Sequence, residues 1–89
     1  MEISFDPLKR EQTLRKRGLD FLDAPEVFLG RIYEWIDNRF EYGEERWVTV
    51  GRLRGRMVVV VWTQRELRHV ISMRKANERE QAYYEELLG

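Results

Sequence analysis

The amino-acid sequence predicts an α+β fold in which an antiparallel β-sheet packs against helices. Three successive segments between Arg46 and Arg74 have the apolar patterns of strands: RWVTVGRL, RMVVVVWTQ and LRHVISMR. Helical signals flank them on both sides, near the start of the chain and at residues 76–88. With 89 residues the chain can form one small core, so we expect a single domain over residues 1–89 with the order β-α-α-β-β-β-β-α.

The first predicted elements are a short strand and a helix. Residues 3–5 are apolar enough for a strand. Asp6 is a capping residue and Pro7 suits the first position of a helix, so a helix is expected to begin there. It runs to about Arg17, because Gly18 can form the C-terminal cap.

A second helix, a strand and a turn are predicted next. Asp20 caps a helix that runs to about Phe28, and Gly30 ends it. Residues 31–37 indicate a strand of uncertain register, because neither face is clearly polar. An acidic turn at residues 38–45 leads into the three main strands.

The three main strands are predicted to form a meander with residues 31–37. Gly55 supplies the positive φ of a tight hairpin between the first two. The run from Val58 to Val61 is typical of a central strand that is covered on both faces. The last strand, residues 67–74, follows a turn at residues 64–66. Simple alternation places four of its side chains on one face: Arg68, Val70, Ser72 and Arg74.

Composition excludes several classes of site. The chain has no cysteine, which rules out disulfides, thiolate metal sites and cysteine nucleophiles. Its only histidine, His69, cannot organise a zinc site alone, so we expect no metal and no other cofactor. No apolar run approaches the roughly 20 residues needed to span a membrane, and the first residues lack the pattern of a signal peptide. A cytoplasmic protein is therefore expected.

Charge is segregated along the chain, although the formal net charge is zero. Residues 46–79 contain nine basic and two acidic residues, a balance of +7. Residues 18–45 contain two basic and eight acidic residues, a balance of −6. A basic sheet beside an acidic connector predicts an anion-binding face.

Four segments carry a family resemblance: FDPLKREQTLRKRGLDF, DNRFEYGEERWVTVGR, MVVVVWTQR and RHVISMRKANERE. In these segments, and over nearly the whole chain, the sequence resembles the BrnT toxins of bacterial type II toxin-antitoxin systems. The resemblance implies a RelE-like fold and RNA cleavage without a metal ion in the bacterial cytoplasm. It also implies a cognate BrnA-like antitoxin that joins a ribbon-helix-helix DNA-binding part to a toxin-binding part. Arg17 and Phe40 depart from the family pattern, since they stand where members carry histidines.

The implied chemistry is cleavage of a phosphodiester by the 2'-hydroxyl of the RNA itself. It requires removal of a proton, stabilisation of a dianionic transition state and protonation of the leaving oxygen. Arginine binds phosphate bidentately and keeps its charge, so strand arginines suit the second task. The candidate catalytic residues are Lys9, Lys16, Glu45, Arg46, Arg68 and Arg74, and the candidate RNA-binding residues are Arg10, Arg15, Arg17 and Arg52.

Several of these signals have a purely structural interpretation. His69 and Tyr84 also carry a suitable proton, but His69 alternates with apolar residues and is interpreted as a partly buried, hydrogen-bonded residue outside the site. The three tryptophans could stack bases, but in so small a domain they are interpreted as core. Strand arginines can also form ion pairs, for example with Glu80, and the cations of the first helix can be a solvated face.

Two rival functions use the same residues. With Arg17 and Phe40 in place of histidines, the chain could be a non-catalytic homologue that binds its antitoxin and contributes to operon autoregulation. It could also be an RNA-binding module. A ribonuclease would leave cyclic phosphate or 3'-phosphate ends without added metal, whereas a binding module would leave RNA intact and associate in a salt-sensitive way. Operator DNA is expected only through the antitoxin complex, because the sequence has no helix-turn-helix signature.

Overall fold

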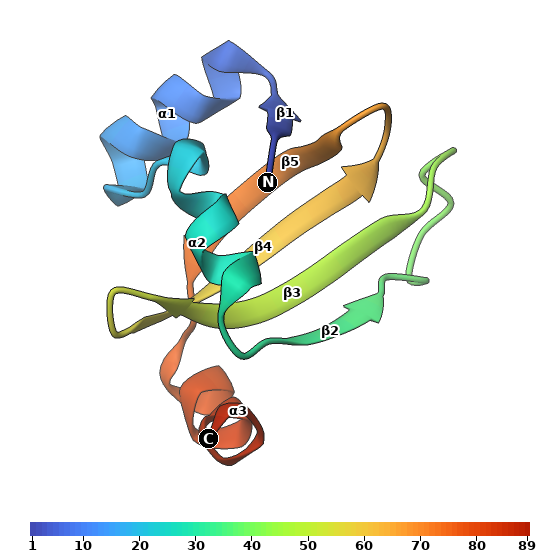
Figure 1. The fold of residues 1–89 in the computed structure, drawn as a ribbon. Coiled ribbons are helices and arrows are strands. Elements are labelled where there is room, and N and C mark those ends of the chain that lie inside the picture. Colours follow the sequence, from blue (N-terminus) through green and yellow to red (C-terminus); the bar gives the residue numbers. More distant parts are fainter.

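The computed structural model describes all 89 residues and has the predicted α+β architecture and element order (Figure 1). One five-stranded sheet is accompanied by three α-helices and one short 3₁₀-helix. Most element ends agree with the predictions to within about two residues, but the predicted second helix is divided: its first turn is a 3₁₀-helix, and the α-helix begins only at Ala24. In chain order the elements are β1 (Ile3–Phe5), α1 (Pro7–Arg17), η1 (Phe21–Asp23), α2 (Ala24–Leu29), β2 (Tyr33–Ile36), β3 (Arg46–Leu53), β4 (Arg56–Gln64), β5 (Arg68–Lys75) and α3 (Glu78–Leu88).

The sheet has the strand order β1-β5-β4-β3-β2. Strands β2 to β5 form the predicted antiparallel meander, and β4 is central, as its valine run indicated. Strand β1, whose place in the sheet the sequence left open, pairs parallel with β5 at the edge. Its register sets Ser4 beside His69, and this pairing matters for the site described below.

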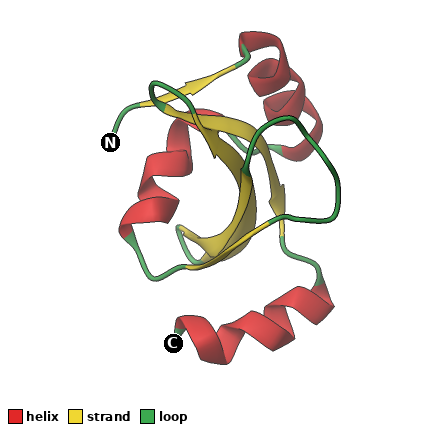
Figure 2. Cartoon of the chain, turned by 90° about the vertical axis from the view of Figure 1, so that its right-hand side faces the viewer, coloured by secondary structure: helices red, strands yellow, loops and turns green.

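The two faces of the sheet are covered unequally (Figure 2). On one side, which we call the helix face, η1 and α2 pack against the strands. On the other side, which we call the open face, α1 and the loop of residues 37–45 stand at opposite margins and α3 covers only one end. No helix therefore lies over the middle of the open face.

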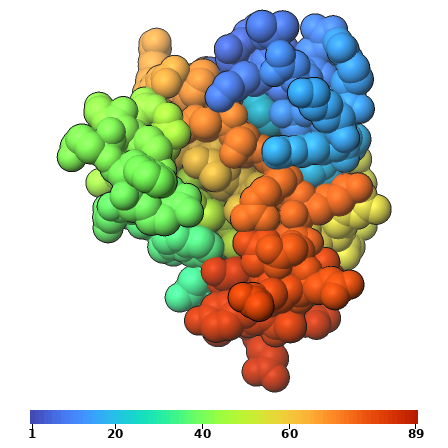
Figure 3. Space-filling view, turned by 180° about the vertical axis from the view of Figure 1, so that it is seen from behind, coloured from blue at the N-terminus to red at the C-terminus, as the bar shows by residue number.

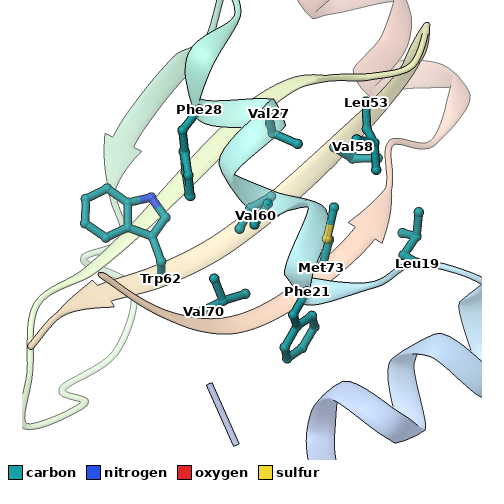
Figure 4. Close-up of a cluster of buried hydrophobic side chains, with 11 residues drawn as sticks. Leu19, Phe21, Val27, Phe28, Leu53, Val58, Val60, Trp62, Val70 and Met73 are labelled. Atoms are coloured by element: carbon teal, nitrogen blue, oxygen red, sulfur yellow. The ribbon is translucent and has the colours of Figure 1, made fainter. Parts of the chain in front are cut away.

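The main core lies on the helix face (Figure 4). Phe21, Val27 and Phe28 pack onto β-strand residues that include Val60 and Trp62. Trp47 stacks on Trp62 with a centroid distance of 5.6 Å, which confirms that these two tryptophans belong to the core. The remaining buried members of this cluster are Leu19, Ala24, Leu53, Val58, Val70 and Met73.

A second, smaller core lies under α3 on the open face. Leu88 at the end of α3 is fully buried against valines of β3 and β4, including Val50 and Val59. Trp35 and Tyr84 pack on this cluster and stack on each other with ring centroids 5.7 Å apart. This contact attaches α3 to the sheet. At its start the helix is stabilised by a capping box that Asn77 and Glu80 form.

A bulge in β5 changes the predicted arrangement of side chains. Val61 of β4 is opposite Ser72, but the next residue, Trp62, is opposite Val70, so Ile71 is the extra residue. Such an insertion shifts the alternation by one position. The predicted shared face of Arg68, Val70, Ser72 and Arg74 is therefore wrong: the first two lie on the helix face and the last two on the open face.

Helix α1 is held by polar contacts rather than by a core. None of its residues is buried, and Leu8 and Leu14 are exposed. Arg10 forms a two-pronged ion pair with Asp20, at 2.8 and 2.9 Å. Arg17 donates a hydrogen bond of 2.9 Å to the carbonyl oxygen of Met73 in β5. Met73 follows the part of β5 that pairs with β1, so this carbonyl group is free to accept it. These contacts fix α1 along the outer edge of β5.

Candidate functional site

Three side chains form a row across the middle strands of the open face. Thr63 of β4 is the register partner of Arg46 in β3 and of His69 in β5, so all three point to the same side. Thr63 is buried, and its hydroxyl donates to the carbonyl oxygen of Glu45 at 2.6 Å. In Figure 3 this face is hollowed, with β4 and β5 at the floor and the loop of residues 37–45, α1 and α3 around it.

His69 presents one ring nitrogen to this hollow. Its Nδ1 shares a 2.9 Å hydrogen bond with the Ser4 hydroxyl, which β1 brings alongside. Its Nε2 has no hydrogen-bond partner and is not buried. Burial lowers the pKa of His69, and the charge of Arg65 lowers it further. In the tautomer that carries its proton on Nδ1, with the Ser4 hydroxyl as acceptor, the neutral ring can accept a proton at Nε2.

Arg46 is a cation with unused hydrogen-bonding capacity. Its guanidinium lies over the Tyr42 ring, 4.0 Å from the centroid, and its Nε is 3.6 Å from a carboxylate oxygen of Glu44. That Nε is buried without a hydrogen-bond partner, and the side chain is only 29% exposed. A guanidinium held by a ring and a distant carboxylate can direct its terminal N–H groups to an anion.

Hydrogen bonds within the loop of residues 37–45 hold the Tyr42 ring, on which the Arg46 guanidinium lies. Asp37 is buried and accepts hydrogen bonds from the Arg39 guanidinium, at 2.9 and 3.0 Å, and from the Tyr42 hydroxyl, at 3.0 Å. The contacts to Arg39 come first in lowering the pKa of Asp37 well below its usual range. The carboxylate thus stays charged and holds the Tyr42 ring in place.

Arg74 lies at the end of the hollow next to α3. Its guanidinium binds Glu80 bidentately, at 2.7 and 2.8 Å, and its side chain is 43% exposed. The same contact lowers the pKa of Glu80 to about 2. Two of the candidate catalytic arginines, Arg46 and Arg74, thus share the open face, but Arg74 already has a carboxylate partner within the chain.

A pocket of about 200 Å³ lies between α1 and β5, at the side of the hollow opposite the loop of residues 37–45. Lys9 and Lys16 line it, and neither is within ion-pair distance of a carboxylate. The charge of Lys9 also acts on the neighbouring His69. The other lining residues are Gln12, Thr13, Arg17, Ile71 and Ser72.

Several predicted site residues lie elsewhere or are engaged in structural contacts. Arg68 is on the helix face, with its guanidinium 4.5 Å from the Phe28 ring centroid and 3.9 Å from that of Trp62. Its predicted place beside Arg74 is therefore wrong, because the bulge at Ile71 separates the two.

The remaining predicted cations are dispersed. Arg52 lies at the far end of the sheet and donates to the Gly89 carbonyl oxygen at 3.0 Å. Arg10 is engaged with Asp20, and Arg15 pairs with Glu11 on a strongly exposed part of α1. The side chain of Glu45 is exposed, whereas Glu44 interacts with Arg46 and Arg65.

His69 is the residue that the sequence analysis left out of the site. Its interpretation as a half-buried, hydrogen-bonded residue is confirmed by the contact with Ser4. Its position beside Arg46 depends on strand register, which no local pattern in the sequence gives. The available signal was that it is the only histidine in the chain.

Two further findings concern cofactors and membranes. The structure contains no cluster of three or more histidine, cysteine or acidic side chains arranged to hold a metal ion. None of its helices combines the length and the apolar character required for crossing a membrane.

Comparison with known proteins gives one family. A family model described as ribonuclease toxin, BrnT, of type II toxin-antitoxin system matches residues 5–80. The matched range contains the whole row of Arg46, Thr63 and His69, the pocket along α1 and the Arg74–Glu80 pair. No curated protein matches the chain.

Proposed function

This chain belongs to the BrnT family of ribonuclease toxins of type II toxin-antitoxin systems, and we propose that it cleaves RNA on the open face of its sheet without a metal ion. The observation that carries the proposal is the row of Arg46, Thr63 and His69. It combines an accessible neutral imidazole nitrogen with a guanidinium that has no hydrogen bond of its own. These are the two kinds of group that phosphodiester cleavage by a 2'-hydroxyl needs.

The proposed reaction uses the RNA as its own nucleophile. His69 Nε2 takes the proton of the 2'-hydroxyl, and the 2'-oxygen forms a bond to the adjacent phosphorus. The bond from phosphorus to the 5'-oxygen of the next nucleotide breaks, and that oxygen takes a proton from the Lys9 ammonium group. The products are a 2',3'-cyclic phosphate and a 5'-hydroxyl end.

Arginines stabilise the transition state in this proposal. Arg46 binds the non-bridging phosphate oxygens with its terminal N–H groups, because its carboxylate contact is long. Arg74 contributes charge from the end of the hollow while it remains paired with Glu80. The partly buried position of Arg46 strengthens its interaction with phosphate relative to an exposed arginine.

The test is RNA cleavage by the purified chain in the presence of a chelator, with analysis of the ends. His69→Asn keeps a polar group near the Nδ1 position but lacks Nε2, and we expect it to lower the cleavage rate by about 10²- to 10⁴-fold. Arg46→Ala should lower the rate by about 10²- to 10³-fold. Arg56→Ala, at the exposed hairpin away from the open face, serves as the control and should cleave like the parent.

Two outcomes would contradict this assignment. Cleavage that needs a divalent metal ion would argue against a mechanism that uses only side chains. Cleavage that persists in a folded His69→Asn variant would remove His69 as the base. Thermal unfolding of each variant shows whether a lost activity reflects a lost fold.

We also propose that a cognate ribbon-helix-helix antitoxin inhibits the chain by covering the open face. An acidic or amphipathic antitoxin segment would meet Lys9 and Lys16, which have no carboxylate partner, and Arg46, whose only carboxylate contact is the 3.6 Å one with Glu44, and would bury the hollow. Binding of operator DNA is assigned to the complex, through the DNA-binding part of the antitoxin.

One observation favours an alternative function. Arg10 and Arg74, both predicted to act on RNA, are each engaged bidentately by a carboxylate of the chain, and Arg17 binds a backbone carbonyl. A catalytically inactive homologue that only binds its antitoxin and contributes to autoregulation would use these arginines in that structural way. This alternative predicts normal growth and intact RNA when the soluble chain is expressed without antitoxin.

A further inference from the structure

We propose that the pocket between α1 and β5 binds a non-scissile phosphate of the RNA, adjacent to the phosphate that is cleaved. This inference rests on the proposed ribonuclease function and adds a subsite to it. The pocket is lined by three cationic side chains and by no carboxylate: Lys9, Lys16 and Arg17.

The sequence of α1 places these groups together. Lys9, Thr13 and Lys16 are separated by four and three residues, and side chains at such spacings lie along one side of a helix. The acidic residue of α1, Glu11, pairs with Arg15 outside the pocket. The repulsion among the pocket cations is therefore not offset by any carboxylate within the chain, and an anion would offset it.

The pocket also has neutral hydrogen-bonding groups suited to a phosphate. Thr13 and Ser72 bring hydroxyl groups and Gln12 brings an amide. A volume of about 200 Å³ is below that of pockets for drug-sized ligands, which matches a phosphate with part of its sugar. The Arg17 contact with the Met73 carbonyl fixes the wall without occupying all its N–H donors.

The position of the pocket relative to His69 indicates which phosphate it binds. Because Ile71 is the extra residue of the bulge, Ser72 lies opposite Val61 and His69 opposite Thr63, so the two are offset by two positions of β4, or roughly 7 Å. Lys9 lines the pocket, and its positive charge also lowers the pKa of His69. A phosphate in the pocket is therefore displaced from His69 along the strand, and we assign it to a neighbour of the scissile phosphate on the same RNA strand.

The test measures the salt dependence of RNA binding by the full chain. The probe is a short 2'-O-methyl RNA, which lacks the nucleophile and stays intact. Affinity is measured between about 50 and 200 mM salt, where each lost phosphate contact reduces the slope of log K against log salt by about 0.7 for single strands. Lys16→Gln should reduce the slope by about 0.7.

The control is Arg79→Gln, which also removes one positive charge from an exposed position but lies on α3, away from the pocket. It should leave the slope unchanged. An unchanged slope in folded Lys16→Gln would overturn the proposal, and so would an equal loss in both variants, since that would indicate a general charge effect. If inorganic phosphate shifts the amide resonances of Thr13 and Ser72 while the RNA slope stays unchanged, the pocket binds free anions and the RNA subsite is rejected.

This experiment is independent of cleavage. A reduced slope in Lys16→Gln supports the subsite even if the parent chain cuts no RNA, in which case only the ribonuclease proposal fails. Metal-independent cleavage by the parent with an unchanged slope in Lys16→Gln leaves the ribonuclease proposal standing and removes the subsite.

Discussion

At the residue scale, the reactive groups of the open face owe their properties to their neighbours. His69 is partly buried and next to Arg65, and both effects favour its neutral form. Ser4 occupies Nδ1 and so leaves Nε2 for other partners. Arg46, unlike His69, forms no side-chain hydrogen bond within the chain. Its Nε is buried with no partner, and its nearest carboxylate oxygen, on Glu44, is 3.6 Å away. The terminal N–H groups of Arg46 also make no hydrogen bond within the chain, and a bound phosphate would satisfy them.

A pH profile of cleavage tests the role of His69. A base must be deprotonated, so kcat/KM should rise with pH and reach a plateau above the pKa of His69. Because burial and Arg65 lower that pKa, the midpoint should lie below the ordinary value of 6.5. The other charged groups that act on the ring are Glu44, Asp6 and Lys9.

The matched variant is Ser4→Ala, which removes the hydrogen bond to Nδ1 but keeps the imidazole. We expect the midpoint of its profile to change, since Nδ1 loses its hydrogen-bond partner. A profile that stays the same in His69→Asn as in the parent would mean that another group titrates.

At the element scale, helices α1 and α3 are attached to the sheet mainly by a few specific contacts. Helix α1 has no buried side chain and depends on Asp6, Arg10 and Arg17 for its position. Helix α3 buries only Leu88 and begins at a capping box in which Glu80 also binds Arg74. Both helices border the hollow, so polar contacts at their ends define its margins.

Glu80→Gln tests how α3 is fixed. The substitution can keep the capping box, since glutamine also suits this position, but it removes the charge that pairs with Arg74. We expect a loss of about 0.5–1 kcal/mol in the free energy of unfolding at neutral pH, measured by urea denaturation.

The sign of the pH effect follows from the pKa. The contact with Arg74 lowers the pKa of Glu80 from 4.5 to about 2, so its contribution to stability is present above 4.5 and is lost as the pH falls toward 2. The difference between parent and Glu80→Gln should therefore shrink between pH 4.5 and pH 3. Glu86→Gln, an exposed change on the same helix, is the control, and an equal effect there would assign the loss to helix charge in general.

At the scale of the whole molecule, the surface along α1 has cations without carboxylate partners, and the surface at the loop of residues 37–45 has ion pairs. Lys9 and Lys16 at the margin along α1 lack carboxylate partners, whereas two acidic residues of the loop of residues 37–45, Asp37 and Glu44, pair with arginines. The chain as a whole is neutral, so the proposed binding of RNA requires this local separation of charge rather than a net charge. Only one side of the sheet offers such a surface, because η1 and α2 cover the other.

If the antitoxin covers the open face, toxin binding to antitoxin and to RNA must be mutually exclusive. We expect stoichiometric antitoxin to displace 2'-O-methyl RNA and to raise the unfolding temperature of the chain, because it binds only the folded state. Fluorescence anisotropy with labelled RNA measures the displacement. A stable ternary complex of toxin, antitoxin and RNA would show that inhibition occurs elsewhere on the molecule.

The sequence by itself determined the elements, their order, the central place of β4 and the segregation of charge, because each depends on signals within a few residues. Asp6, Gly18 and Gly55, for example, act through local backbone preferences. Only the tertiary structure decided which side chains meet. The bulge at Ile71 moved Arg74 to the open face and left Arg68 on the helix face. Pairing between strands that are distant in sequence brought His69 into line with Arg46 and Ser4, and no local pattern contains that register.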